Sequence, residues 1–343
     1  FFFFPRQVGK TTLALDFLEK HKKLPLEQHP AYLSWDLPAS KQKILTVDLP
    51  PDEPMIVFDE IHKYPRWRNL IKGIYDTYKN EKKFIVTGSA KLDHFRKGGD
   101  SLMGRYHYYR LHPLSLREFG GSADELLKLG GFPEPLYDGT ETFWRRWQRE
   151  RIQKVIYEDL QNLERVKEVS LIELLVNALP DRVGSPLSIK SLREDLEVAH
   201  ETVSRWIGIL ETLYLVYRIA PYGSPKIRAV KKEQKLYFWD WSQVAGDGFR
   251  FENMVASHLL KYCHFVEDTQ GFAMELRFLR DTDGREVDFV VLKDKKPLFA
   301  VECKFGEKSL SPRIEYFCHR TPIPYFYQVH LGQRHLKYPA SRA

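Results

Sequence analysis

The chain begins with FFFFPRQVGKTTLALDFLEK, residues 1–20, and this stretch decides the fold of its amino-terminal part. The four phenylalanines predict a short buried strand, and Pro5 to Gly9 predict a turn. Residues 10–20 have helical spacing, with Leu13, Phe17 and Leu18 on the inward face. The predicted order is therefore strand, tight loop and helix.

The loop and the helix start carry GKTT, which is the pattern of a phosphate-binding loop. Backbone amides at a helix start point toward an anion, Lys10 adds a positive charge, and the Thr11 hydroxyl suits Mg²⁺. We therefore expect ATP and Mg²⁺ as ligands. The loop residues expected to bind the nucleotide are Pro5, Arg6, Gln7, Val8, Gly9, Lys10, Thr11 and Thr12.

One position departs from this pattern. Phe4 stands five residues before Gly9, where the pattern has glycine, and its Cβ would crowd the phosphates. The chain also starts without methionine, so we expect a truncated start or misassigned first residues. Taken alone, GKTT is equally compatible with a chance match at a helix start.

The composition sets wider limits. With 343 residues, 43% of them hydrophobic, the chain is long enough for two or three domains. A net charge of +7 and a pI near 9.0 favour an acidic partner, most often nucleic acid. The three cysteines, Cys263, Cys303 and Cys318, form no metal motif or disulfide framework, which favours a reducing compartment and predicts a cytoplasmic protein. No apolar stretch is long enough to span a bilayer, and no signal peptide is visible.

A buried strand ending in two acids follows in PMIVFDEIHKYPRW, residues 54–67. Met55 to Phe58 is a continuous apolar run, typical of a central parallel strand. We expect Asp59 to hold Mg²⁺ and Glu60 to polarise the attacking water. The alternative, two solvated acids at a strand end, is disfavoured by the upstream GKTT.

Two further positions keep alternatives open. The apolar strand in KKFIVTGSA, residues 82–90, ends near Thr87 and Ser89, which either sense the γ-phosphate or close a simple turn. Arg105 is either a surface residue or an arginine finger for its own or a neighbouring subunit, which leaves a homo-oligomer open. Strands that alternate with helices predict a parallel sheet with crossover helices.

Five motifs occur in a set order: FPRQVGKTT, IVFDEIHKYPRW, FIVTGSA, LMGRYHYYRLHPLSLREF and GGFPEPL. In this order they resemble the AAA+-type ATPases that are common in archaea and bacteria, and the resemblance covers nearly the whole chain. It implies ATPase activity in the first part. In the second part it implies a winged helix followed by a PD-(D/E)xK nuclease-like domain of poorly defined function.

The middle of the chain is predicted to be helical after a domain edge at GGFPEPL. We interpret the basic residues of the helix within 141–166 as a solvated face, with phosphate contact as the alternative. These residues are Arg145, Arg146, Arg149 and Arg151.

Residues 168–222 have the spacing of a winged helix. In its recognition helix an apolar stripe is formed by Val203, Trp206, Ile207, Leu210 and Leu213. Thr202, Ser204 and Arg205 lie outside this stripe, where DNA would be read. A basic strip beyond it is a predicted contact for duplex DNA: Lys226, Arg228, Lys231, Lys232 and Lys235. The alternative is a module that packs only against protein.

The last motif is REVDFVVLKDKKPLFAVECKF, residues 285–305, which predicts a hairpin of two strands. Glu286 and Asp288 share a face of the first strand, and Glu302 and Lys304 share a face of the second. If the faces match, Asp288 and Glu302 converge on one Mg²⁺ beside Lys304. The resemblance implies that Glu252 completes this site. The alternative is the polar face of an exposed hairpin.

The sequence therefore predicts an α/β fold at both ends of a helical middle. The expected parts are a P-loop ATPase domain with a parallel sheet over residues 1–125, a helical linker over 126–166, a winged helix over 167–222 and an α/β nuclease-like domain over 223–343. We expect an ATPase whose nucleotide state controls a DNA-binding or DNA-cleaving carboxyl half. The alternative is a nucleotide-gated recruitment protein whose nuclease-like domain is inert.

The expected site residues fall in two groups. Those expected to act in catalysis are Lys10, Glu60 and Arg105 in the first part and Glu252, Asp288, Glu302 and Lys304 in the last. Those expected to hold metal ions are Thr11, Asp59, Asp288 and Glu302, and Ser89 is expected to contact the nucleotide.

Overall fold

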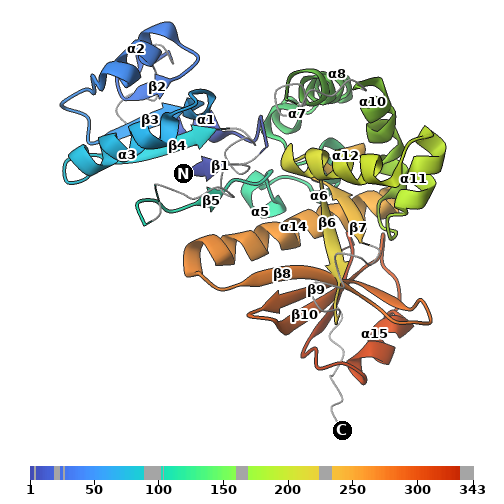
Figure 1. Ribbon diagram of the computed structural model, residues 1–343. Coiled ribbons are helices and arrows are strands. Elements are labelled where there is room, and N and C mark those ends of the chain that lie inside the picture. The colour runs from blue at the N-terminus through green and yellow to red at the C-terminus, as the bar shows by residue number, and fades with distance from the viewer. Residues whose placement is uncertain are drawn as a thin grey trace.

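The computed structural model describes residues 1–3, 5–18, 24–25, 28–88, 102, 104–159, 169–223 and 234–332. Figure 1 shows three regions: an amino-terminal sheet with its helices, a helical middle and a carboxyl-terminal sheet. Phe4, Ser89 and the basic residues of 226–232 lie outside the described residues, so the expectations placed on them stay predictions.

The amino-terminal sheet is parallel, with the strand order β2-β3-β4-β1-β5. Its strands are β1 (Phe2–Phe3), β2 (Tyr32–Ser34), β3 (Met55–Asp59), β4 (Lys83–Gly88) and β5 (Tyr109–Arg110). Its helices are α1 (Lys10–Asp16), α2 (Pro38–Thr46) and α3 (Trp67–Tyr78). Ile56, Val57 and Phe58 in the middle of β3 are fully buried, as expected of a strand covered on both faces. The predicted parallel α/β arrangement of this part is confirmed.

The inward face predicted for this segment is confirmed in part. Leu18 is buried as predicted, just beyond the end of α1, and Lys10 and Ala14 are buried within the helix, whereas Leu13 is half-buried and Phe17 is 47% exposed. The expectation that Phe17 faces inward is wrong, because the buried stripe is set by Lys10 facing the loop. Gly9 caps the helix at a φ of 90°, a left-handed conformation that favours glycine.

The middle of the chain is helical. Its helices are α5 (Leu116–Phe119), α6 (Ala123–Leu129), α7 (Pro133–Asp138), α8 (Glu141–Gln153), α10 (Val169–Ala178), α11 (Ile189–Leu196) and α12 (His200–Thr212), and α8 continues as a π-helix over Lys154–Asp159. The side chains of Ser122, Thr140 and Ser188 each accept a hydrogen bond from an amide of the first turn. These caps satisfy donors that a helix start leaves without an intrahelical partner.

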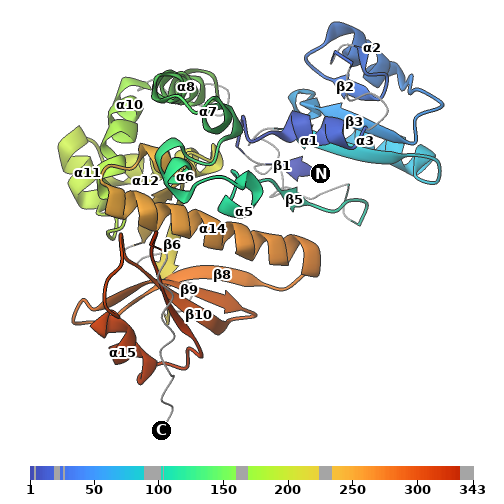
Figure 2. The same ribbon diagram turned by 180° about the vertical axis from the view of Figure 1, so that it is seen from behind.

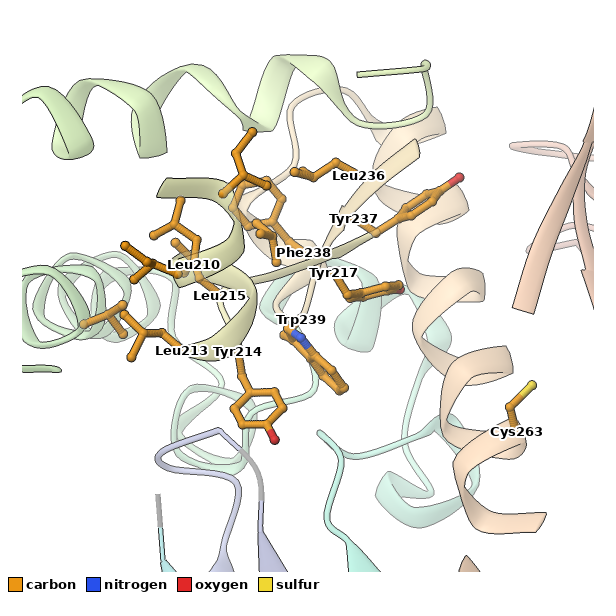
Figure 3. Close-up of a cluster of buried hydrophobic side chains, with 14 of the residues drawn as sticks. Leu210, Leu213, Tyr214, Leu215, Tyr217, Leu236, Tyr237, Phe238, Trp239 and Cys263 are labelled. Atoms are coloured by element: carbon orange, nitrogen blue, oxygen red, sulfur yellow. The ribbon is translucent and has the colours of Figure 1, made fainter. Parts of the chain in front are cut away.

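The apolar stripe predicted in α12 is buried at each of its five positions. It packs near β6 (Val216–Pro221) and β7 (Lys235–Phe238), which form an antiparallel pair (Figure 3). The side chains of Tyr217 and Tyr237 in this pair point toward the long helix that carries Cys263 (Figure 3). A winged helix has this order of elements, in which helices are followed by a pair of strands. The identification of this region as a winged helix stays a prediction.

The carboxyl-terminal sheet has the strand order β11-β10-β9-β8-β6-β7. Its later strands are β8 (Met274–Arg280), β9 (Glu286–Lys293), β10 (Lys296–Cys303) and β11 (Phe326–Val329). β9 and β10 form the predicted hairpin, with Asp294 and Lys295 at positive φ in the turn. β9 is buried from residue 287 to residue 292, so the exposed-hairpin alternative does not hold.

Helix α14 (Asp247–Gln270) connects the parts of the molecule, and α15 (Pro312–Cys318) lies near the chain end. In both views α14 lies between the carboxyl-terminal sheet and the α5–α6 segment (Figures 1 and 2). The domain boundary expected after residue 222 falls inside the sheet, because β6 pairs with β7 and with β8. None of the helices in the described residues is long and apolar enough to cross a membrane.

Candidate functional site

The phosphate loop closes around its own lysine. Gln7 and Gly9 have φ values of 65° and 90°, and these left-handed conformations bend the chain tightly. Lys10 is 8% exposed, and its Nζ donates a hydrogen bond to the carbonyl oxygen of Pro5 at 2.7 Å. Of the other predicted loop residues, Arg6 is half-buried and Thr12 is exposed.

Asp59 ends β3 beside this loop. The strand register places it next to Thr87 at the carboxyl edge of the sheet. The hydroxyl of Thr87 donates to Asp59 Oδ1, the hydroxyl of Tyr32 donates to Oδ2, and Thr11 Oγ1 lies 3.5 Å from Oδ2. Burial, and then the charge of Asp59, raises the pKa of Tyr32, so this hydroxyl keeps its proton. The carboxylate therefore faces the start of α1 and is held there by hydroxyl groups.

Glu60 follows Asp59 with a φ of 54°. Its carboxylate lies 3.3 Å from Lys63 Nζ and 3.8 Å from His62 Nε2. Burial raises the pKa of Glu60, and the positive charges of Lys63 and Lys10 oppose that rise. A general base works best when its pKa is close to the operating pH. The environment of Glu60 thus suits the role predicted for it.

Thr11 and Asp59 fit the requirements of Mg²⁺. In nucleotide sites this ion takes one or two protein oxygens and completes its shell with phosphate oxygens and water. The two side-chain oxygens are 3.5 Å apart, so both can reach one ion. Thr87 donates to Asp59, and the predicted sensor Ser89 lies outside the described residues.

The helical middle packs directly on the phosphate loop. This contact was not predicted from the sequence. Gln7 Nε2 donates to Glu134 Oε2 at 3.3 Å, and Trp147 Nε1 donates to the same oxygen at 2.8 Å. Val8 is buried against Phe132 and Trp147. The GGFPEPL segment, which was predicted to be a domain edge, therefore also packs against the phosphate loop.

Two of the arginines named from the sequence, Arg105 and Arg151, have partners that the sequence did not indicate. Arg105 Nε donates to Asp76 Oδ1 in α3 at 2.9 Å, so the structure does not bring it to the side chains around Asp59. Arg151 was interpreted as part of a solvated face, but it is 3% exposed and its guanidinium lies 4.1 Å from the centre of the Phe132 ring. The helical period explains this burial, because Arg151 lies four residues after the buried Trp147.

At the other end of the chain, Asp288 and Glu302 lie on neighbouring strands. Val301 pairs with Phe289, so the next position brings Glu302 opposite Asp288. The two residues are 8% and 0% exposed. The amide of Cys303 donates to Asp288 Oδ2 at 2.7 Å, and Lys304 Nζ donates to Glu302 Oε1 at 2.5 Å.

Lys235 lies among these acids, although the sequence placed it in the DNA-binding strip. It is 0% exposed, and its Nζ forms ion pairs with Glu286 and, at 3.3 Å, with Glu252. Tyr237 donates to the same Glu252 oxygen at 2.8 Å. The expectation for Lys235 is wrong, because β7 is buried along its whole length and Lys235 shares with Tyr237 the face of the strand that contacts Glu252.

These carboxylates do not fit the predicted metal ion. Three of the four carboxylates are paired with an ammonium group: Glu252 and Glu286 with Lys235, and Glu302 with Lys304. Asp288 accepts from the Cys303 amide. Within the described part of the chain, no three His, Cys, Asp or Glu side chains are grouped so that they could hold a metal ion. Burial, and then the charges of Glu252 and Glu302, raises the pKa of Asp288 to about 8, which favours its neutral form.

The amino-terminal sheet contacts α14 through its edge strand β5. The backbone amide of Arg110 donates to Asp268 at 2.8 Å, and its guanidinium pairs with Asp268 at 2.7 Å and with Glu267 at 2.6 Å. His112 Nε2 and His264 Nδ1 lie 2.9 Å apart one turn away. β5 in turn pairs with β1, which leads into the phosphate loop.

The residues that sequence reasoning missed share one signal. Tyr32 and Glu134 are polar groups within otherwise apolar or Pro/Gly-rich segments. A polar group in such a segment requires a partner when it is buried. That signal identifies the residue but not the partner, which comes from a distant part of the chain.

Comparison with known families divides the chain into three segments. Residues 5–120 match a family described as "AAA domain". Residues 121–245 and 247–341 match two families described as domains of unknown function, DUF8612 and DUF4143. The first match agrees with the phosphate loop and with the acidic end of β3.

Similar full-length proteins carry no assigned activity. An uncharacterized protein of Methanocaldococcus jannaschii is 24% identical and covers 89% of this chain and 75% of its own. An uncharacterized protein of Haemophilus influenzae is 22% identical, over 75% of this chain and 68% of its own. The structure of the Aeropyrum pernix ORC1 protein in complex with DNA aligns over 70% of this chain and 83% of that chain, at 14% identity and a TM-score of 0.34. The family match over residues 5–120 supports an AAA-type, nucleotide-binding ATPase domain in that segment.

Proposed function

We propose that the protein binds and hydrolyses ATP at the carboxyl edge of its amino-terminal sheet. The observation that carries this proposal is the approach of Thr11 to Asp59, 3.5 Å apart, beside the loop that encloses Lys10. A phosphate loop, a hydroxyl and a strand-end carboxylate are the parts that phosphoryl transfer requires. The AAA domain match over residues 5–120 supports the same activity.

Each side chain at this site has its own role in the proposed reaction. Lys10 gives up its hydrogen bond to the Pro5 carbonyl oxygen and pairs with the phosphates. A hydrogen bond between two charged groups is stronger than one to a neutral carbonyl. Thr11 and Asp59 hold Mg²⁺, which neutralises charge that develops on the phosphate oxygens. Glu60 orients the attacking water and accepts its proton. Tyr32 and Thr87 fix the carboxylate of Asp59 by donating to both of its oxygens.

We propose further that the nucleotide state controls the carboxyl half through α14. A movement of the phosphate loop acts on β1, on its neighbour β5 and then on the ion pairs of Arg110 with Asp268 and Glu267. α14 has 24 residues, so it spans about 36 Å and carries Glu252 near its other end. A continuous helix transmits displacement because its backbone hydrogen bonds resist bending.

Duplex DNA is the partner we propose for the carboxyl half. The net charge of +7 supports an acidic partner, and Arg205 lies on the exposed side of α12 while the apolar stripe is buried. Binding should weaken steeply with salt, and Arg205→Ala should weaken it on all sequences alike. Binding that ignores salt would contradict this part of the proposal. The recruitment alternative is favoured over cleavage by the ion pairs of Lys235.

Nucleotide binding by Lys10→Ala tests the central activity. Isothermal calorimetry with Mg²⁺ and a non-hydrolysable ATP analogue should show binding in the parent protein and none in the variant. Lys79→Ala, at the exposed end of α3, is the matched control and should bind normally. Equal affinity in all three proteins would remove the phosphate-loop assignment.

A further inference from the structure

We propose that the ammonium group of Lys235 takes the place of a divalent cation in the carboxylate cluster of Glu252, Glu286, Asp288 and Glu302. The native carboxyl-terminal site is then an internal ion-pair network and not a metal centre. This inference is independent of the nucleotide site, because the two sites use different residues and different sheets.

The position of Lys235 is fixed by the backbone on both sides. In β7 it pairs with Ile219 of β6, and it also forms a bridge with Pro186. Its side chain is 0% exposed, so the ammonium group has no access to bulk water. A lysine held in this way cannot reach solvent without opening the sheet.

The ammonium group satisfies two of the four acids. Lys235 Nζ pairs with Glu286 and lies 3.3 Å from Glu252 Oε1, which also accepts from Tyr237 at 2.8 Å. Buried carboxylates need such a cation, because removal from water strongly disfavours an unpaired charge. A divalent cation at Glu252 or Glu286 would have to compete with Lys235 for the same oxygens, and the ammonium group would repel it.

The other two acids are engaged by separate donors. Asp288 Oδ2 accepts from the Cys303 amide at 2.7 Å, while Glu302 Oε1 accepts from Lys304 at 2.5 Å and from Ser311 at 3.2 Å. Glu302 Oε2 is buried and makes no hydrogen bond to another described group. Glu302 lies opposite Asp288 across the strands, and its Oε2 is the part of a metal site that remains when a lysine supplies the positive charge.

The proposal predicts a latent metal site that removal of Lys235 opens. The full chain is titrated with MnCl₂ in the absence of nucleotide, with calorimetry and thermal unfolding as readouts. In Lys235→Met, Mn²⁺ at about 100 times its Kd should raise Tm by about 5 °C. Adding Asp288→Asn to this variant should abolish the rise. In the parent protein, Asp288→Asn should leave the response of Tm to Mn²⁺ unchanged.

Two controls keep the test decisive. Lys261→Met removes another lysine from an ion pair, that with Glu118, and should gain no Mn²⁺ binding. The double variant Lys235→Met/Glu286→Gln removes both members of one ion pair and replaces the single variant if that one unfolds. Circular dichroism checks that each variant is folded. Mn²⁺ binding to the parent protein that is lost in Asp288→Asn overturns the proposal. No gain of binding in a folded Lys235 variant overturns it as well.

Discussion

The two ends of the molecule each bury carboxylates beside a lysine, and they hold that lysine in opposite ways. Lys10 donates to a backbone carbonyl oxygen, and Asp59 is left to hydroxyl donors. Lys235 is paired directly with Glu252 and Glu286. Neutral donors can yield to a metal ion, whereas a buried ammonium group cannot leave without unpaired charges. The same residue types thus form a ligand site in one place and a structural ion pair in the other.

The largest expected effect separates the two sites by activity. Glu60→Gln should lower kcat for ATP hydrolysis by roughly 10²–10⁴-fold, which is the contribution typical of a positioned base, and should retain nucleotide binding. Asp288→Asn is the matched change in the carboxyl half and should leave hydrolysis largely intact. Steady-state phosphate release measures both. A similar loss of kcat in the two variants would contradict the separation of the two sites.

The lysines should differ in their effect on stability. Lys235→Met should lower the free energy of unfolding by about 3–5 kcal/mol, because it leaves two buried carboxylates without their cation. Lys10→Met loses one hydrogen bond to a carbonyl, which costs about 1 kcal/mol. Urea unfolding monitored by tryptophan fluorescence gives both values. The reverse order would mean that Lys10 is the structural lysine.

The border between the two halves should be sensitive to acid. Burial, and then the neighbouring charges, lowers the pKa of His112 well below its usual value, and burial followed by Arg110 does the same for His264. The cationic groups that face this pair are Arg110 and Lys261, His258 is a further titratable group beside it, and the acids nearby are Glu267 and Asp268.

A histidine in an unfolded chain titrates near pH 6.5, so the unfolded state binds protons first as the pH falls. Stability from the neutral pair is therefore fully present above about pH 6.5 and is lost as the pH falls toward the lowered pKa. The urea midpoint should drop more between pH 7.5 and 5.5 in the parent protein than in His112→Gln. Equal drops would show that the pair does not carry this dependence.

The smallest expected effect concerns Tyr32. Tyr32→Phe removes one donor to Asp59, which should cost about 1 kcal/mol of stability in the absence of nucleotide. The KM for MgATP should change by less than about tenfold, because Thr87 still holds the carboxylate. A complete loss of hydrolysis would instead make Tyr32 part of the catalytic machinery.

Patterns within one segment allowed most of the elements to be predicted. The GKTT helix start, the apolar β3 that ends at Asp59, the stripe of α12 and the β9–β10 hairpin all follow from local periodicity. The alternation of strands also gave the pairing of Asp288 with Glu302, because the period of two fixes their faces.

The partners of buried polar groups could not be predicted in this way. Lys235 belongs to a basic run in sequence, and only the pairing of β6, β7 and β8 brings it to Glu252 and Glu286. Glu134 reaches Gln7 across 127 positions of the chain. Such contacts depend on tertiary packing, which residue spacing does not encode.

The most direct test of the central claim is anomalous diffraction from crystals grown with MnCl₂ and a non-hydrolysable ATP analogue. The account predicts a Mn²⁺ peak between the Thr11 hydroxyl and the Asp59 carboxylate. It predicts no peak between Asp288 and Glu302, where Lys235 supplies the positive charge. A peak at Asp288 and Glu302, or none beside Asp59, would contradict it.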